Sequence, residues 1–319
     1  MRIKSLTLAG KSIRFTLIMC LLTLAIVTGC SSDTKTTTEV SEFDVVKDAV
    51  AEYLMHKVGN TKAEDLETMI SDGVAPYIVS IRSAEDFNTG HIPGAVNYTF
   101  GSLNSVPEGK EILIYCYTGQ SSSFGAVVLS VLGYNVQNLL NGMSSWTTDP
   151  NIFKTRFDPV KDQGDYQIET TAVEGINYPY PALENTISTS KSEIIKAAVT
   201  AVSPKYITNN ELNQKIANNE EMTILDVRNS DHYAAGHIPG AIHIEMDNLA
   251  DNLKKLNPDA PVYVYCYTGH TSAQATALLQ ILGYNAYSLK FGMCSWSSDP
   301  SVNLDKCFNA SNIVDYPVE

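Results

Sequence analysis

The chain has 319 residues, enough for two ordinary domains that each bury a hydrophobic core. Hydrophobic residues make up 44% and charged residues 18%, a composition that excludes an intrinsically disordered protein. The formal net charge of −13 argues against nucleic acid or an anionic membrane surface as a binding partner. Six cysteines are too few for a disulfide-stabilised scaffold of this length, so each needs its own interpretation.

The amino terminus predicts export and a lipid anchor. Basic residues precede an apolar run from Phe15 to Val27, which is short for a membrane span and typical of a signal peptide. The run ends in Val-Thr-Gly-Cys30, which resembles the lipobox of bacterial lipoproteins, where cleavage precedes an acylated cysteine. We expect removal of residues 1–29, lipidation of Cys30, and a polar tether over 30–41 at the periplasmic or extracellular face of a membrane. A retained apolar anchor and an ordinary cleaved signal are the alternatives.

The rest of the chain is an internal duplication. Cys116 and Cys266 are 150 positions apart, whereas the two copies of His-Ile-Pro-Gly-Ala, which begin at His91 and His237, are 146 apart. A small insertion therefore lies between these two motifs. The predicted organisation is a first domain over 42–154, a tail and linker over 155–190, and a second domain over 191–319.

The second copy shows the order of elements clearly. The expected elements, in chain order, are a helix over 211–218, a strand over 223–227, a turn over 237–240, a strand over 241–244, a polar helix around 248–256, a strand over 261–265, a helix after the cysteine loop, and a strand over 286–289. Short apolar strands that alternate with helices predict an α/β domain with a mostly parallel sheet flanked by helices. Ligands bind outside the carboxyl ends of such strands, where both repeated cysteines fall.

A reactive cysteine is predicted at the end of one strand in each copy. An apolar run ends at Cys116 or Cys266, and a polar loop with one glycine leads into a helical pattern. Backbone N–H groups and the positive end of the helix dipole converge there, which favours the nucleophilic thiolate. We predict both cysteines as nucleophiles, and a packing role for a small buried cysteine is the alternative. The residues expected to form the substrate-binding loops are Tyr117, Thr118, Gly119, Gln120, Ser121 and Ser122, and Tyr267, Thr268, Gly269, His270, Thr271 and Ser272.

Charged residues near these loops have supporting roles. Asp226 and Arg228 are expected to form a buried pair that orients neighbouring loops, because buried charges must be paired. In the first copy Ser80 takes the place of the aspartate, so Arg82 needs another partner, such as Asp86.

His270 lies inside the second loop and has two interpretations. It could tune the thiolate as a cation or hydrogen-bond donor, or it could be an ordinary solvated side chain.

Cys294 and Cys307 have no counterparts in the first copy and are thirteen residues apart. In an exported protein this spacing favours a disulfide that closes the C-terminal tail. The alternative makes Cys294 a resolving thiol for Cys266.

Four motifs in the same order in both copies resemble the rhodanese (sulfurtransferase) domain. In the second copy they are Asp226-Val-Arg228, Gly236–Ala241, Cys266–Gly269, and Gly292 followed by Trp296. The first copy matches through Arg82, Gly90–Ala95, Cys116–Gly119, Gly142 and Trp146. The resemblance implies two tandem rhodanese-like domains that move a sulfane sulfur, through a cysteine persulfide, from a small sulfur donor to a thiol or other nucleophilic acceptor, which could be a protein.

Two other classes of function compete with the sulfurtransferase. A cysteine-dependent phosphatase needs an arginine about six residues after the cysteine, and Ser122 and Ser272 stand there instead. A non-catalytic module that binds persulfides or thiols and delivers sulfur at the membrane remains the alternative. The sequence contains no metal-ligand cluster and no glycine-rich nucleotide fingerprint, so neither a metal nor a cofactor is expected.

Overall fold

The computed structural model describes residues 41–319. The predicted signal peptide and lipidation site lie outside the described residues. Between residues 41 and 319, no helix is both long and apolar enough to cross a membrane.

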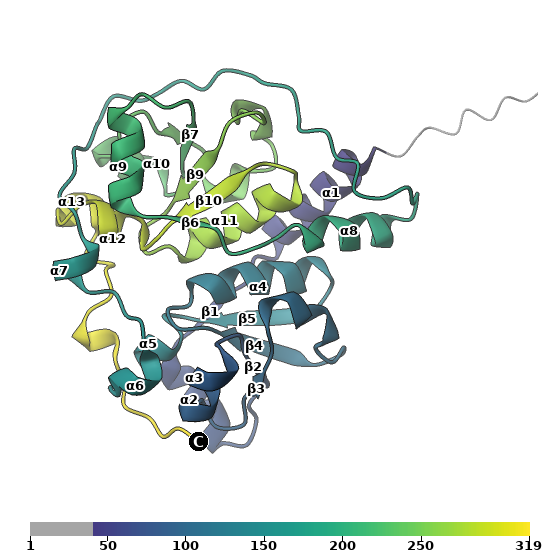
Figure 1. Cartoon of the computed structure of the whole chain (residues 1–319), viewed down its shortest axis with the longest axis vertical. Coiled ribbons are helices and arrows are strands. Elements are labelled where there is room, and N and C mark those ends of the chain that lie inside the picture. Colours follow the sequence, from purple (N-terminus) through teal and green to yellow (C-terminus); the bar gives the residue numbers. More distant parts are fainter. Residues whose placement is uncertain (1–40) are drawn as a thin grey trace, which may run out of the picture. The chain divides into compact units, whose positions relative to one another are not determined.

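The first copy folds around a parallel five-stranded sheet with the strand order β1-β5-β4-β2-β3 (Figure 1). Its strands are β1 (Asn60–Thr61), β2 (Tyr77–Ser80), β3 (Val96–Asn97), β4 (Glu111–Tyr115) and β5 (Asn135–Leu139). Its helices are α2 (Ala63–Ser71), α3 (Ala84–Thr89), the 3₁₀ helix η1 (Phe100–Ser105), α4 (Gln120–Val131), α5 (Met143–Trp146) and α6 (Pro150–Phe153). Strand β4 is central, and residues 112–115 are fully buried because helices cover both faces of a parallel sheet.

The second copy repeats this topology with the strand order β6-β10-β9-β7-β8. Its strands are β6 (Tyr206–Ile207), β7 (Thr223–Asp226), β8 (Ile242–His243), β9 (Val262–Tyr265) and β10 (Ala286–Leu289). Its helices are α9 (Asn209–Ala217), α10 (Ser230–Ala235), η2 (Met246–Asn248), η3 (Leu253–Lys255), α11 (His270–Ile281), α12 (Gly292–Trp296) and α13 (Pro300–Asn303). The prediction of two α/β domains with parallel sheets is confirmed. The polar helix expected around 248–256 is wrong in kind, because two short 3₁₀ helices stand there.

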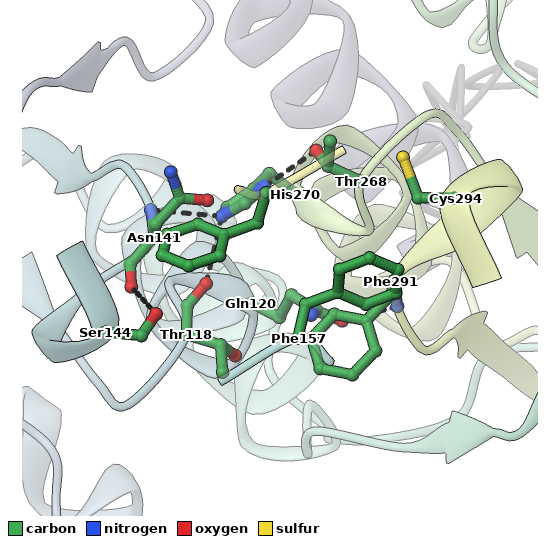
Figure 2. A pocket seen from close by; sticks show the side chains of 10 residues that line it. Thr118, Gln120, Asn141, Ser144, Phe157, Thr268, His270, Phe291 and Cys294 are labelled. Carbon is green, nitrogen blue, oxygen red and sulfur yellow. Dashed lines mark hydrogen bonds between the residues drawn. The ribbon is translucent and has the colours of Figure 1, made fainter. Parts of the chain in front are cut away.

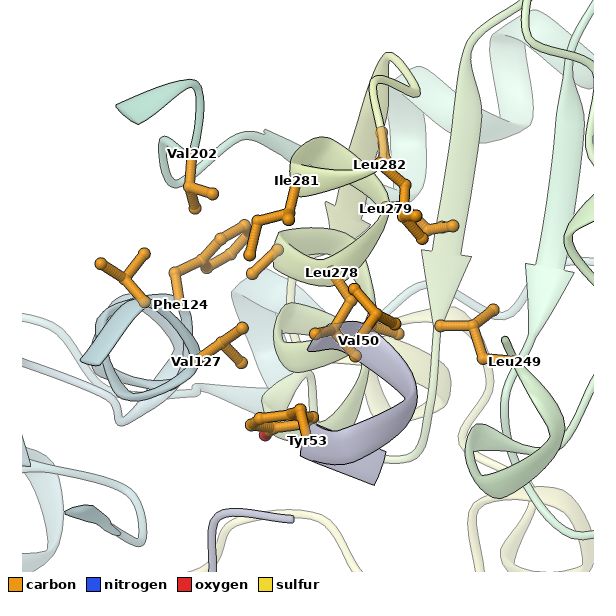
Figure 3. Close-up of a cluster of buried hydrophobic side chains, with 14 of the residues drawn as sticks. Val50, Tyr53, Phe124, Val127, Val202, Leu249, Leu278, Leu279, Ile281 and Leu282 are labelled. Carbon is orange, nitrogen blue, oxygen red and sulfur yellow. The ribbon is translucent and has the colours of Figure 1, made fainter. Parts of the chain in front are cut away.

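The two domains share a hydrophobic core. Helix α4 packs along α11, and each domain is preceded by a helix, α1 (Glu42–Met55) or α8 (Lys191–Thr200), that joins this contact. Figure 3 shows Phe124 and Val127 of α4 facing the same cluster as Leu278 and Ile281 of α11. Because the two cysteine loops lead into α4 and α11, packing of these helices brings the loops of both domains together.

The segment that follows each sheet packs on the opposite domain. Residues 164–169 pair with the second domain, where the backbone N–H of Tyr166 donates to the carbonyl of Trp296 and Glu169 exchanges two hydrogen bonds with His237. Residues 314–319 pair with the first domain in the same way. The backbone N–H of Tyr316 donates to the carbonyl of Trp146. Glu319 and His91 exchange two backbone hydrogen bonds. Part of the segment interpreted as tail and linker therefore completes the second domain.

Candidate active site

Both cysteines lie at the carboxyl end of the central strand of their sheet. Cys116 follows β4 and Cys266 follows β9, and a three-residue loop leads from each cysteine into α4 or α11. The cysteines are 2% and 3% exposed, and both carry free thiols. The strand–loop–helix pattern of the sequence predicts this location.

Hydrogen-bond donors of each loop are directed at the sulfur. The backbone N–H and the hydroxyl of Ser122 lie 3.4 and 3.5 Å from Sγ of Cys116. In the second domain the backbone N–H of Gly269 lies 3.2 Å from Sγ of Cys266. Donors at a helix N-terminus stabilise negative charge on a bound or covalently attached group.

Glycine is required where the loop meets the next turn of the chain. A Cβ on Gly142 would lie 2.5 Å from the carbonyl oxygen of Cys116, and a Cβ on Gly292 would lie 2.5 Å from that of Cys266. Both glycines also have a positive φ, 52° and 53°. The two glycines of the rhodanese-like motif therefore permit the close packing of backbone that closes each cysteine loop.

An open pocket of about 290 Å³ contains Cys266. Lys57 and Asn60, which belong to the first domain's part of the chain, line it together with residues of the second domain. The other lining residues are Val58, Val227, Arg228, Asn229, Glu245, Met246, Asp247, Tyr267, Thr271 and Gln274. Lys57 forms an ion pair with Asp247 across this pocket. The site at Cys266 is thus built by both copies of the duplication.

Gln120 and His270, the first residues of α4 and α11, reach into the opposite loop. The side-chain oxygen of Gln120 accepts a hydrogen bond of 3.2 Å from the backbone N–H of Phe291. Nε2 of His270 lies 3.0 Å from the carbonyl oxygen of Thr118 and 3.3 Å from the backbone nitrogen of Asn141 (Figure 2). Asn141 and Phe291 are themselves equivalent positions, 150 residues apart. The two contacts are therefore related by the duplication.

His270 is a buried structural residue of this contact. It is 4% exposed, and its Nδ1 lies 2.9 Å from the hydroxyl of Thr268. Burial lowers the pKa of His270 from 6.5 to about 4, and the hydrogen bond with Thr118 opposes that shift only in part. His270 is consequently neutral near pH 7 and buried, so the interpretations as a cation and as a solvated side chain are wrong, while a role as a hydrogen-bond donor to the thiolate stays a prediction.

The remaining loop side chains differ in what they contact. The hydroxyl of Tyr117 donates to the carboxylate of Asp86, and the hydroxyl of Tyr267 hydrogen-bonds with Nδ1 of His232. Ser272 hydrogen-bonds with Ser288, whereas Thr271 lines the Cys266 pocket.

Arg228 forms the expected buried pair. Its guanidinium group lies 2.7 Å from the carboxylate of Asp226, and both side chains are fully buried. Two further hydrogen bonds, to the carbonyls of Gly236 and Val302, fix the guanidinium. Tyr265 also donates to the Asp226 carboxylate. The carboxylate thus ties together the ends of β7 and β9.

Arg82 is equally buried, but none of the described carboxylates pairs with it. Its guanidinium donates to the backbone carbonyls of Gly90, Asp86 and Ile152 at 2.7–2.8 Å. Its Nε has no hydrogen-bond partner within residues 41–319. The suggested partner Asp86 does contact Arg82, but through its backbone carbonyl. The Asp86 carboxylate instead accepts hydrogen bonds from Ser83 and Tyr117.

Cys294 and Cys307 are joined in a disulfide. The backbone N–H of Cys294 donates to the carbonyl of Tyr267 at 2.9 Å. The disulfide therefore fastens the segment that leads to the C-terminus to the loop that follows Cys266. In this state Cys294 has no thiol with which to resolve a bond to Cys266.

Comparison with known proteins identifies the fold family. The family described as "Rhodanese-like domain" matches residues 62–149 and 208–299, together more than half of the chain. The chain belongs to the rhodanese-like family. Thiosulfate sulfurtransferase GlpE of Pseudomonas entomophila (strain L48) is 40% identical over 80 residues, which are 25% of this chain and 73% of that protein. The protein of the same name from Pseudomonas fluorescens (strain SBW25) is 43% identical over 74 residues, 23% of this chain and 68% of that protein.

Among solved structures, a rhodanese-like domain protein from Staphylococcus aureus is 36% identical and covers 29% of this chain and 90% of its own, with a TM-score of 0.28. The resemblance inferred from the motifs is confirmed by the family match. The relatives support sulfur transfer at the level of the rhodanese-like family.

Sequence reasoning missed the residues that each domain contributes to the other's site. Lys57 and Asn60 line the pocket of Cys266, and Tyr206 hydrogen-bonds to Ser121 in the Cys116 loop at 2.9 Å. Aligning the two copies would have shown that Asn60 and Tyr206 are equivalent, but not that they face the opposite domain.

Proposed function

We propose that this rhodanese-like protein is a sulfurtransferase whose principal nucleophile is Cys266. The observation that carries this proposal is that Cys266 lines an open pocket and that its sulfur lies 3.2 Å from the backbone N–H of Gly269. The Cys266 thiolate attacks the outer sulfur of a donor, and the donor's S–S bond breaks, with its electron pair leaving on the remaining fragment. An acceptor thiolate then attacks the outer sulfur of the Cys266 persulfide, and Cys266 departs as a thiolate.

The charges of the pocket favour persulfide and polysulfide donors over thiosulfate. Lys57 and Arg228 are balanced by the carboxylates of Asp247 and Asp226, and Glu245 adds a further negative charge. Among the described residues that line the pocket, a dianion such as thiosulfate therefore meets no uncompensated cation. Backbone N–H donors suffice better for the single charge of a persulfide.

The test is mass spectrometry of the purified protein after treatment with polysulfide or thiosulfate. We expect one added sulfur atom on the peptide that contains Cys266, and its loss when a thiol acceptor or cyanide is added. Cys266→Ser should not gain this sulfur, whereas Cys116→Ser should keep it. Many turnovers with a small acceptor would support catalysis, whereas release of only one sulfur atom per protein would favour the sulfur-delivery module. If Cys266 gains no sulfur, both functions are refuted.

We further propose that the protein is exported and held to a membrane by lipid on Cys30. The support is the Val27–Cys30 sequence and the polar tract behind it, together with a disulfide of the kind that persists in oxidising compartments. Cys30→Ala should release the protein from membranes of its native host. Continued fractionation of this variant with membranes at high salt would contradict the lipid anchor.

A further inference from the structure

Asn60 and Tyr206 occupy equivalent positions in the two domains. Each is the first residue of the edge strand of its sheet, and the strand register pairs Asn60 with Asn138 and Tyr206 with Ser288. Asn138 and Ser288 are 150 residues apart, as the two cysteines are. One position of the duplication therefore carries a small polar side chain in one copy and a large aromatic one in the other.

Both positions face the site of the opposite domain. Asn60 of the first domain is exposed and lines the open pocket of Cys266 beside Thr271, while its side-chain oxygen accepts a hydrogen bond of 2.9 Å from Asn138 of its own sheet. Tyr206 of the second domain is half-buried, and its hydroxyl lies 2.9 Å from the hydroxyl of Ser121, the equivalent of Thr271. Tyr206 thus lies beside the Cys116 loop. At the equivalent place beside the Cys266 loop stands the smaller Asn60.

The surroundings of Tyr206 are also more aromatic than those of Asn60. The ring of Phe124 packs edge-on against Tyr206 with centroids 5.8 Å apart, whereas Gln274 stands at the equivalent position and lines the Cys266 pocket. Burial raises the pKa of the Tyr206 phenol, and negative charge on Cys116 adds to that rise. The hydrogen bond to Ser121 holds the phenol beside the loop that follows Cys116.

We propose that the residue at this position decides access to the cysteine of the opposite domain, so that Tyr206 closes the Cys116 site and Asn60 leaves the Cys266 site open. This inference rests on the proposed function in one respect, because it assigns uptake of an external sulfur donor to Cys266. Tyr206 acts here as a residue that controls access and specificity, not as a catalytic residue. The two cysteines are almost equally buried, so the difference between the sites lies in the open pocket beside Cys266 and the tyrosine beside the Cys116 loop.

The test measures how fast each cysteine is alkylated by iodoacetamide, a small neutral probe, in the full chain with its disulfide intact. Peptide mass spectrometry reports Cys116 and Cys266 separately in the same sample. In the wild type we expect Cys266 to react about tenfold faster or more, since alkylation of a covered group waits for local opening. Equal rates for the two cysteines in the wild type would overturn the proposal.

Exchanging the two residues gives a matched pair of variants. Tyr206→Asn should raise the Cys116 rate to near that of Cys266, and Asn60→Tyr should slow Cys266 by about tenfold, if closure by the ring controls local opening. The two variants alter opposite sites, so failure of one to fold leaves the other as a complete test. If the ratio of the Cys266 to the Cys116 alkylation rate does not change in a folded variant, control of access by that residue is refuted.

Tyr206→Phe is the control for the ring. It removes the hydrogen bond to Ser121 and keeps the aromatic cover, so Cys116 should stay slow. If Cys116 is alkylated as fast in Tyr206→Phe as in Tyr206→Asn, the aromatic ring is not the barrier. Alkylation needs no sulfur donor, so the proposed sulfur transfer can fail while this pattern holds, and the pattern can fail while Cys266 still transfers sulfur.

Discussion

Protonation of His270 should weaken the protein below pH 6.5. Burial holds the pKa of His270 at about 4 in the folded protein, whereas in the unfolded chain it returns to about 6.5. Between these two values the unfolded chain binds a proton that the folded protein does not. The free energy of unfolding therefore has its full His270 contribution above pH 6.5 and loses it as the pH falls toward 4.

The size of this loss follows from the difference in pKa. A fall from 6.5 to about 4, at about 1.4 kcal/mol per pH unit, corresponds to about 3 kcal/mol. His270 is 4% exposed, so solvent screens its charge little. At about 2–4 °C per kcal/mol for domains of 150–250 residues, Tm should fall by about 6–12 °C from this one group.

The assay compares urea denaturation of the wild type and of His270→Gln at several pH values between 7 and 4. Glutamine is the residue at the equivalent position, Gln120, and it does not titrate. The difference in free energy of unfolding between the two proteins should shift by about 3 kcal/mol across this range in favour of the variant. Parallel pH profiles for the wild type and His270→Gln would refute the reasoning.

Three further predictions follow from other contacts of the structure. Ser80→Asp should stabilise the first domain by about 1–3 kcal/mol in chemical denaturation, because a carboxylate can reach the unpartnered Nε of the buried Arg82. Deletion of residues 313–319 should expose Trp146, visible as a red shift of tryptophan fluorescence in a Trp296→Phe background, since Tyr316 packs on that indole with centroids 5.2 Å apart. Asp247→Asn should lower the KM for thiosulfate by freeing Lys57 from its ion pair, and the gain should fade as salt rises.

The fold and the location of the cysteines could be predicted because they depend on local patterns. Residues 112–115 form a continuous apolar run that ends at Cys116, and such a run is typical of a strand buried on both faces. The directions of the loop side chains could not be predicted in this way. Gln120 and His270 lie in the loops expected to bind substrate, yet each faces the opposite domain because α4 packs against α11. That packing joins residues about 150 positions apart, which no local pattern records.

The partner of the buried arginine could be inferred from the sequence in the second domain but not in the first. Asp226 and Arg228 are two residues apart on one strand end, so their pairing is a local matter. Arg82 has the same position without the aspartate. Two backbone carbonyls of α3 and its C-cap and one of α6 accept hydrogen bonds from its guanidinium instead. Backbone carbonyls carry no sequence signature, so an arginine that relies on them cannot be matched to its partners from side-chain types.

The reciprocal contacts explain how two similar domains can differ in one chain. The segments 164–169 and 314–319 each complete the other domain, and Gln120 and His270 each bond the opposite loop. Such self-complementary exchange is the geometry of a twofold dimer, in which both copies must carry the same residue at every position. Joining the copies covalently removes that constraint. One copy can then carry Asn60 beside the open pocket of Cys266, while the other carries Tyr206, whose hydroxyl bonds Ser121 in the loop of the opposite cysteine.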